Sequence, residues 1–316
     1  MRRRSWARPA ASSGQLYGRF LPASQPRPVY SPPVRSPRSQ IQYGPKAAHT
    51  ATVIMLHGLG DTGNGWAPVA PEMAMDHVKW IFPTAPTRQI TVNMGMSMPG
   101  WFDIDHLDEA KFVEMMQGTT GFDDEGTNES VDYVLKLIEA EIKSTGIPAD
   151  RIVLGGFSQG GHIALKAILR QRDSVAGMGR LAGIMALSTW IEPVQAEVDE
   201  ATRKTPLLYG HGSSDPLIPA QVAQLSADHL QQKLNFQDVR FKMYPGMQHS
   251  TCFEEMEDMK TFLMALLPPK DDVEVKPEDI ESMSVRELKS FIVRKGGDPS
   301  AMLEKGELKQ AARSLL

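Results

Sequence analysis

A single serine lies between two glycines in the segment from Gly156 to Gly160, which reads GFSQG. An apolar run ending at Leu154 precedes this segment, and helix formers with apolar side chains at helical spacing follow it from His162 onward. A G-x-S-x-G motif between a strand and a helix is typical of a nucleophile elbow, a sharp turn that holds the serine hydroxyl above the edge of a sheet. The pattern therefore predicts Ser158 as a nucleophile. A phosphate-binding loop is disfavoured, because no Lys-Ser or Lys-Thr pair follows the glycines.

A serine hydroxyl needs a base to take its proton, and the base needs a carboxylate to orient it. Behind a nucleophile elbow these partners follow in the chain order serine, acid, histidine. Asp215 comes after the predicted strand 206–209, and His249 comes after the predicted strand 239–244. Because loops that follow parallel strands meet at one edge of a sheet, we expect Asp215 to orient His249 beside Ser158.

Other histidines and aspartates compete for these two roles. His57 and His211 also lie on loops at strand ends, but both precede the position expected of a base that closes the chain order. Further aspartates lie on predicted loops at positions 61, 103 and 105. The order rule favours His249 and Asp215 over these residues.

The oxyanion of an acyl-transfer transition state needs backbone donors as well. We assign the first donor to the N–H of Gln159, the residue after the nucleophile. The second is expected from the loop His57 to Gly60, whose glycines allow close backbone approach, and we select Leu59. This chemistry needs no cofactor, and no metal site is expected, because the histidines lack zinc-ligand spacing and only one cysteine is present.

The elements that must position these residues alternate along the chain. Strands are predicted at 52–56, 80–82, 152–154, 183–187, 206–209 and 239–244, and helices at 66–76, 127–144, 162–171, 220–234 and 252–267. The last helix is expected to bury Phe253, Met256, Met259, Leu263 and Leu266. Strands that alternate with helices predict an α/β fold with a mostly parallel sheet flanked by helices.

A methionine-rich segment, expected to be a loop or cap, runs from Thr87 to Asp103 and contains Met94, Met96 and Met98. Methionine at this density serves either as core filler or as an adaptable lining for an alkyl chain, and the sequence leaves both readings open. Residues 106–126 are polar and are predicted to form a partly helical surface excursion.

Composition sets the domain boundaries. The chain has 316 residues, of which 41% are hydrophobic, enough for one substantial core and a small module. Residues 1–48 are rich in Arg, Ser and Pro and predict a disordered extension, with an organelle transit segment as the alternative. The catalytic domain is expected at 49–268 and a charged linker at 269–280. A small helical module is predicted at 281–316, where Ser284 and Glu287 form a capping-box pattern.

Charge and cysteine content limit partners and compartment. All 38 acidic residues but only 25 of the 34 basic residues lie from Asp61 onward, so this part carries a net charge of −13 and nucleic-acid binding is disfavoured. One cysteine precludes an internal disulfide and suits a reducing compartment. We therefore expect a cytoplasmic protein, with the mitochondrion or plastid as the alternative if the N-terminus is a transit segment.

Several of these motifs together resemble the acyl-protein thioesterases, lysophospholipase-like carboxylesterases of the α/β-hydrolase fold. They are 57–63 (HGLGDTG), 101–104 (WFDI), 155–161 (GGFSQGG), 215–216 (DP) and 246–250 (GMQHS). The resemblance covers about residues 50 to 268. It implies a serine hydrolase that removes long acyl groups, typically palmitoyl thioesters on protein cysteines. The triad it implies is Ser158, Asp215 and His249, and the oxyanion donors are Leu59 and Gln159.

The resemblance also implies that the loop holding Met94, Met96, Met98 and Trp101 accommodates the acyl chain. The sequence departs from the family at His162, where relatives commonly have a small residue, and in the longer excursion at 106–121. Both terminal extensions lie outside the family pattern. The segment from Ser284 to Leu315 resembles a SAP-like helical module, for which a protein contact or a purely structural role is expected.

The leading hypothesis is thus depalmitoylation of S-acylated proteins, with transient contact at a membrane surface. Cleavage of oxygen esters by the same site, as in a lysophospholipase or a general carboxylesterase, is the close alternative. A different class of function is a non-catalytic adaptor that uses the hydrolase fold as a scaffold and binds a protein through its C-terminal module.

Overall fold

The computed structural model describes residues 39–46, 49–118, 122–174, 179–194, 197–270, 277–295, 297–299, 302 and 304–316. The disordered extension or transit segment predicted for the N-terminus lies outside the described residues up to position 38, so both readings stay predictions.

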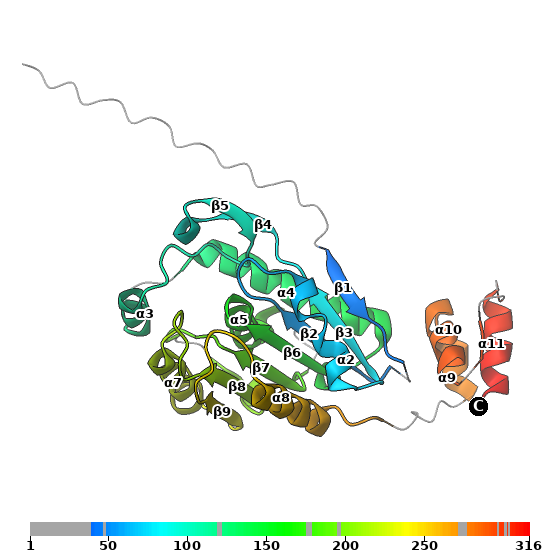
Figure 1. Cartoon of the computed structure of the whole chain (residues 1–316). Helices are drawn as coiled ribbons and strands as arrows, with labels where there is room; N and C mark the ends of the chain where they lie inside the picture. Colours follow the sequence, from blue (N-terminus) through cyan, green and yellow to red (C-terminus); the bar gives the residue numbers. More distant parts are fainter. Residues whose placement is uncertain are drawn as a thin grey trace, which may run out of the picture. The chain divides into compact units, whose positions relative to one another are not determined.

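A seven-stranded sheet forms the centre of the larger domain, in the order β1-β3-β2-β6-β7-β8-β9 (Figure 1). The strands are β1 (Gln40–Tyr43), β2 (Ala51–Leu56), β3 (Val78–Pro83), β6 (Ile152–Phe157), β7 (Gly183–Leu187), β8 (Leu207–Gly212) and β9 (Val239–Tyr244). Neighbouring strands are parallel except for β1 and β3, which are antiparallel. The predicted α/β fold with a mostly parallel sheet is confirmed.

The domain begins earlier than the predicted boundary at residue 49. Strand β1 lies inside the stretch predicted as disordered, and Ile41 pairs with Phe82 of β3. Ile41 packs against the core, and the Tyr43 ring lies edge-on to Phe82 at 6.2 Å. A four-residue strand beside a proline-rich segment has too little periodicity to be recognised alone, because its stability comes from pairing with a distant strand.

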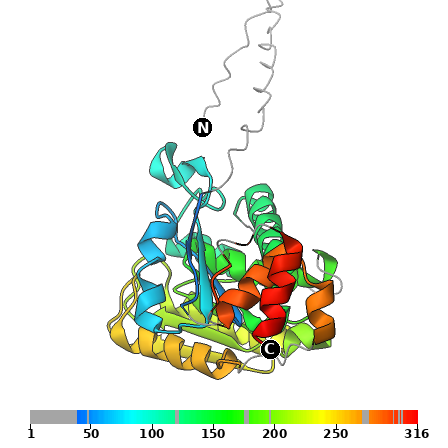
Figure 2. The same ribbon diagram turned by 90° about the vertical axis from the view of Figure 1, so that its right-hand side faces the viewer.

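Helices cover both faces of the sheet. On one face lie α4 (Asp124–Thr145), α5 (Gln159–Ser174) and α7 (Ala220–Asp228), and on the other lie α1 (Gly63–Trp66), α2 (Val69–Met73) and α8 (Phe253–Leu266). Successive strand residues point to opposite faces, so Leu154 packs against α4 and α5 while Val153 packs on the side of α2 and α8. Figure 2 shows α2 (blue) and α8 (yellow-orange) across the sheet from α4 (green).

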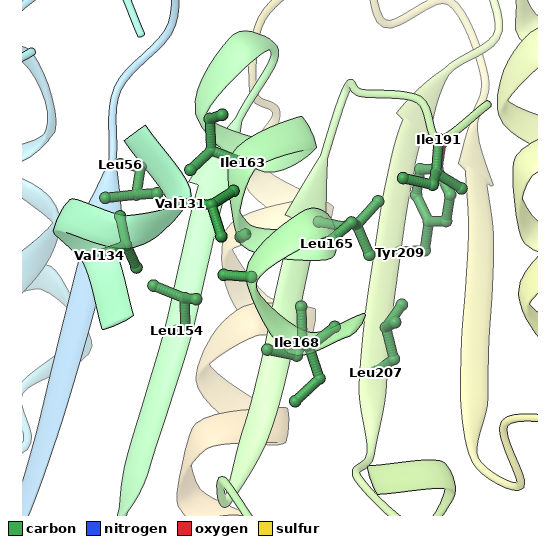
Figure 3. Packing of buried hydrophobic residues seen from close by; sticks show 14 of the residues in the cluster. Leu56, Val131, Val134, Leu154, Ile163, Leu165, Ile168, Ile191, Leu207 and Tyr209 are labelled. Carbon is green, nitrogen blue, oxygen red and sulfur yellow. The ribbon is translucent and has the colours of Figure 1, made fainter. Parts of the chain in front are cut away.

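The core beneath α4 and α5 is built from branched aliphatic side chains. Figure 3 shows residues of the two helices gathered against strand residues: Val131, Val134, Ile163, Leu165, Ile168, Leu56, Leu154 and Leu207. These contacts fix the start of α5, and therefore Ser158, relative to the sheet.

The predicted helix 66–76 is divided into α1 and α2. Pro68 lies between the two helices and lacks the backbone N–H that a continuous helix would need. Helix α8 spans the predicted segment, but Phe253 is 75% exposed rather than buried, and Phe262 occupies the core instead. Phe253 lies six residues, or about one and two-thirds turns, before Met259, so it projects from a different face of the helix.

The methionine-rich segment is a hairpin rather than a loop. Strands β4 (Thr87–Ile90) and β5 (Met96–Pro99) pair antiparallel around the 3-10 turn η1 (Thr91–Asn93). The polar excursion is also more buried than predicted, because α3 (Glu109–Met116) places Phe112 and Met115 in the core. The Phe112 ring packs edge-on against Trp190 at 5.4 Å. The remaining short elements are η2 (Ala149–Arg151), α6 (Glu200–Arg203) and the π-helical turn η3 (His229–Lys233).

The C-terminal helices have a small core of their own. They are α9 (Pro277–Ser282), α10 (Val285–Arg294) and α11 (Lys305–Ser314), and Ile280, Leu288, Phe291, Ile292, Leu308 and Ala312 form the core. The predicted capping box is confirmed, because the Ser284 N–H donates to Glu287 Oε2 (2.5 Å) and the Glu287 N–H donates to Ser284 Oγ (3.2 Å). Helix α9 starts inside the predicted linker 269–280, since Ile280 belongs to this core. The SAP-like identity of the module stays a prediction.

In the described part of the chain, no helix combines the length and the apolar character that crossing a bilayer requires.

Candidate active site

Ser158 occupies the turn between β6 and α5 in strained backbone geometry. Its φ is +53°, in the left-handed region that residues with side chains rarely adopt. Its N–H donates to the Leu187 carbonyl of β7 at 2.8 Å. The flanking glycines leave the space that the turn requires: a methyl group at Gly156 would overlap the Gly160 carbonyl, and one at Gly160 would lie 2.5 Å from the Leu56 carbonyl.

The three side chains predicted to act together are in hydrogen-bond contact. His249 Nε2 lies 2.9 Å from Ser158 Oγ, and His249 Nδ1 lies 2.7 Å from Asp215 Oδ2. Asp215 follows β8 and His249 follows β9, so both reach Ser158 from the carboxyl ends of their strands. A histidine held through Nδ1 by a carboxylate presents Nε2 to the hydroxyl as a proton acceptor.

Asp215 is held in the ionised form. Its side chain is fully buried, which favours the neutral acid, but hydrogen bonds from His249 and from the backbone hold its pKa below the ordinary value. The backbone donors are the N–H groups of Leu217 and Ile218, each 2.9 Å from Asp215 Oδ1. The carboxylate therefore stays charged at neutral pH and keeps one tautomer of His249.

The rival histidines are buried next to the site, and each has a ring nitrogen close to a backbone carbonyl oxygen. His211 is fully buried and its Nε2 lies 3.0 Å from the Ile218 carbonyl. His57 is also fully buried, with Nδ1 at 2.7 Å from the Gly58 carbonyl and Nε2 accepting a hydrogen bond from the Ala85 N–H at 2.9 Å. Burial lowers the pKa of both imidazoles.

The two expected oxyanion donors come from the elbow and from the loop after β2. Gln159 is the first residue of α5, so its N–H has no carbonyl partner within the helix. In the other loop, the Gly60 N–H donates to the Pro99 carbonyl at 2.8 Å and the Asp61 N–H to the Gly58 carbonyl at 3.3 Å, so these two groups are engaged within the protein and Leu59 stays the expected donor. The loop packs against the elbow, since a methyl group on Gly58 would lie 3.4 Å from the Cβ of Ser158.

The residues expected to accommodate an acyl chain are separated. Met94 and Met96 are 91% and 54% exposed at the tip of the β4–β5 hairpin. Met98 is half-buried, and its sulfur lies beside Gly60. Trp101 is fully buried, so its side chain does not line an open pocket. Its indole belongs to the hydrophobic core, and the indole N–H donates to the His57 carbonyl at 2.8 Å.

The side-chain contacts of Gln159 and His162 were not predicted from the sequence. The Gln159 side chain is fully buried and bridges two backbone groups, accepting from the Trp101 N–H and donating to the Phe102 carbonyl, both at 2.7 Å. His162 lies one turn after Ser158, stacked on Trp190 at 5.0 Å, and burial lowers its pKa. Both are polar residues next to a nucleophile motif, which is the only sequence signal for such contacts.

Within the described residues, no group of three or more His, Cys, Asp or Glu side chains is arranged to hold a metal ion.

Residues 39–267 match the family model described as phospholipase/carboxylesterase. Acyl-protein thioesterase 1 of Cryptococcus neoformans is 42% identical over 243 residues, which cover 72% of this chain and 97% of the relative. Acyl-protein thioesterase 1 of Gibberella zeae is 44% identical over 234 residues, which cover 71% and 93%. The crystal structure of acyl-protein thioesterase 2 of Zea mays is 30% identical with a TM-score of 0.61, and the match covers 73% of this chain and 99% of that one.

Proposed function

Because the chain belongs to the phospholipase/carboxylesterase family, we propose that it is a serine hydrolase that removes long acyl groups from the cysteines of S-acylated proteins. The hydrogen-bonded series Ser158–His249–Asp215 carries this proposal. The acyl-protein thioesterases that match most of the domain support the substrate class.

In the proposed reaction, Ser158 Oγ attacks the thioester carbonyl carbon while His249 Nε2 takes the hydroxyl proton. The tetrahedral oxyanion accepts hydrogen bonds from the N–H groups of Leu59 and Gln159. The intermediate collapses, the C–S bond breaks, and His249 returns the proton to the departing cysteine sulfur. Water, deprotonated by His249, then attacks the acyl-serine ester. The acyl–Oγ bond breaks, His249 returns the proton to Ser158 Oγ, and the fatty acid is released. Asp215 stays ionised and stabilises the imidazolium in both half-reactions.

The exposed hairpin tip supports a transient contact with a membrane surface. The acyl chain of an S-acylated protein resides in a bilayer, and Met94 and Met96 form an exposed apolar tip on the β4–β5 hairpin. The last residue of β5, Pro99, accepts a hydrogen bond from the Gly60 N–H of the oxyanion loop at 2.8 Å, so the hairpin adjoins the site. We propose that this tip touches the lipid surface while the thioester enters the site. Methionine suits such a contact because its flexible side chain adapts to irregular apolar surroundings.

For the C-terminal module we propose a protein partner rather than nucleic acid. The segment 277–316 carries seven acidic and seven basic residues, so it has no net charge. On α11, Lys309 and Arg313 both pair with Glu281 of α9. Nucleic-acid binding depends on basic groups that neutralise phosphates, and these two are already neutralised within the module.

Turnover of a palmitoyl-peptide thioester tests the function. We expect release of the free thiol by the wild-type protein and none by Ser158→Ala, with a fluorophosphonate probe labelling only the wild type. Comparison of kcat/KM for this thioester, a lysophospholipid and a short aryl ester separates the thioesterase from the esterase alternatives. Absence of probe labelling in folded wild-type protein would favour the adaptor hypothesis.

A further inference from the structure

His57 is a fully buried imidazole outside the Ser158–His249–Asp215 series, and both of its ring nitrogens have partners. Nδ1 lies 2.7 Å from the Gly58 carbonyl oxygen. Nε2 lies 2.9 Å from the backbone nitrogen of Ala85. Its position at the start of the loop that carries Leu59 suggests a role in that loop.

The partners define the protonation of the ring. The Ala85 N–H can only donate, so Nε2 must present a lone pair. A neutral imidazole with a lone pair on Nε2 carries its proton on Nδ1, and that N–H donates to the Gly58 carbonyl. Burial lowers the pKa of His57 below its ordinary value, which favours the neutral ring.

The Gly58 carbonyl shares one peptide unit with the N–H of Leu59. A trans peptide is planar, and its C=O and N–H point in opposite directions. When the His57 ring holds the carbonyl, the Leu59 N–H is therefore turned away from the ring. This peptide is next to the nucleophile, since a methyl group on Gly58 would lie 3.4 Å from the Cβ of Ser158.

Buried hydrogen bonds tie this loop to the second oxyanion donor. The Trp101 indole N–H donates to the His57 carbonyl at 2.8 Å, and the Trp101 backbone N–H donates to Gln159 Oε1 at 2.7 Å. Gln159 supplies the other backbone donor. The two donors are thus linked through one tryptophan, whose ring also packs on the His57 ring at 5.2 Å.

We propose that His57 is a positioning residue for the oxyanion hole: its Nδ1–H fixes the Gly58–Leu59 peptide so that the Leu59 N–H faces the developing oxyanion. His57 touches neither the substrate nor Ser158 Oγ in this role. The proposal rests on the proposed serine hydrolase function, but not on the identity of the acyl substrate.

Two variants at position 57 separate the effect of the lost hydrogen bonds from the effect of a changed side-chain volume. His57→Phe keeps a ring but removes both hydrogen bonds, whereas His57→Asn retains an amide N–H near the position of Nδ1. Loss of an oxyanion donor lowers kcat by about 10²- to 10³-fold, so a misaligned donor in His57→Phe is expected to lower kcat by about 10- to 100-fold. KM for a soluble aryl ester should change less than about twofold, because the donors act mainly in the transition state. His57→Asn should recover part of the loss.

His77→Phe is the matched control, since His77 is a buried histidine whose Nε2 lies 2.7 Å from the Leu267 carbonyl, away from the nucleophile motifs. We expect unchanged kcat in this variant even if its melting temperature falls. Unchanged kcat in His57→Phe, or an equal loss of kcat in both Phe variants, would overturn the proposal.

A spectroscopic test uses the wild-type protein, so it holds even if the variants do not fold. Long-range ¹⁵N–¹H correlation spectra should show His57 as the neutral Nδ1–H tautomer from pH 6 to pH 9. An Nε2–H tautomer or a protonated ring would refute the mechanism. Hydrolysis of the aryl ester without hydrolysis of the palmitoyl thioester would reject the thioesterase function while leaving the role of His57 testable.

Discussion

Replacing Glu255 with glutamine should stabilise the protein, and the gain should grow with pH. Glu255 lies in the first turn of α8, is fully buried, and its two carboxyl oxygens have no hydrogen-bond partner among the described residues. Burial, with a smaller contribution from the charge of Asp258, raises its pKa from 4.5 to about 8. The folded protein therefore keeps a proton on this group that the unfolded chain loses.

The sign of the pH dependence follows from proton uptake. Between pH 4.5 and about 8 the folded state binds more protons than the unfolded state, so stability falls as pH rises through this range. Below this range both states are protonated and Glu255 carries no penalty. At 1.36 kcal/mol for each pH unit, the penalty reaches roughly 2 kcal/mol at pH 6 and roughly 5 kcal/mol at pH 8. Glu255→Gln has no proton to lose and avoids the penalty.

Thermal unfolding at pH 6 and pH 8, at one ionic strength, measures this difference. A difference of roughly 3 kcal/mol between the two pH values corresponds to about 6 to 12 °C in Tm for a domain of this size. Glu257→Gln is the matched control, because it removes an exposed carboxylate from the same helix. An equal Tm gain at both pH values, or a loss at pH 8, would show that Glu255 is not protonated in the folded state.

Three further outcomes follow from the geometry of the domain. Asp215→Asn should lower kcat by about 10⁴-fold in steady-state hydrolysis with little change in KM, because an amide no longer selects the productive tautomer of His249; near-normal kcat would contradict the assigned triad. Gly156→Ala should lower the free energy of unfolding by more than about 3 kcal/mol in denaturant, because the new methyl group overlaps the backbone at the elbow. Gly146→Ala is the control: its φ is positive but the space around it is open, so the free energy of unfolding should fall by only about 1 kcal/mol. Removal of residues 271–316 should leave aryl-ester kcat within about twofold, because the C-terminal core shares no residue with the two hydrolase cores; a large loss would show that the module supports the active site.

The parts of the fold that were predicted correctly are those whose signal is local. Buried parallel strands such as β6 and β7 are continuous apolar runs, and the elbow, the acid and the histidine follow in a fixed order. The Ser284 capping box is likewise contained in four residues. The serine hydrolase fold and family predicted from these motifs are confirmed by the family match over residues 39–267.

The parts that were missed depend on partners distant in the sequence. Strand β1 becomes recognisable only through its pairing with β3, which begins 35 residues after β1 ends. Phe112 is buried because Trp190 lies across from it, and no pattern within the polar excursion indicates that contact. Trp101 was assigned to an acyl pocket because the family resemblance implied that its loop accommodates the acyl chain. Its indole is instead engaged with His57, and only the folded chain brings these residues together.

The spacing of the strands explains why the loops after β8 and β9 must act as one unit. Ser158 follows β6 and His249 follows β9, three strands away in the sheet, which is roughly 14 Å at the usual strand separation. The His249 loop therefore has to extend back over the sheet edge. Backbone hydrogen bonds join it to the Asp215 loop: the Ser213 N–H donates to the Tyr244 carbonyl at 3.0 Å, and the Ser214 N–H donates to the Met247 carbonyl at 3.0 Å.

The end of this extension rests on the elbow itself. The His249 ring packs against the ring of Phe157, the residue directly before Ser158, with 4.9 Å between the ring centres. The Ser158 carbonyl accepts hydrogen bonds from Thr189 Oγ1 at 2.7 Å and from the His162 N–H at 3.1 Å. The strained serine is thus restrained by β7 and α5 while the base is restrained by the residue that precedes it. The hydroxyl and the imidazole lie 2.9 Å apart although their strands are three positions apart, because the ring is held by Asp215 and packs on the elbow residue that precedes the serine.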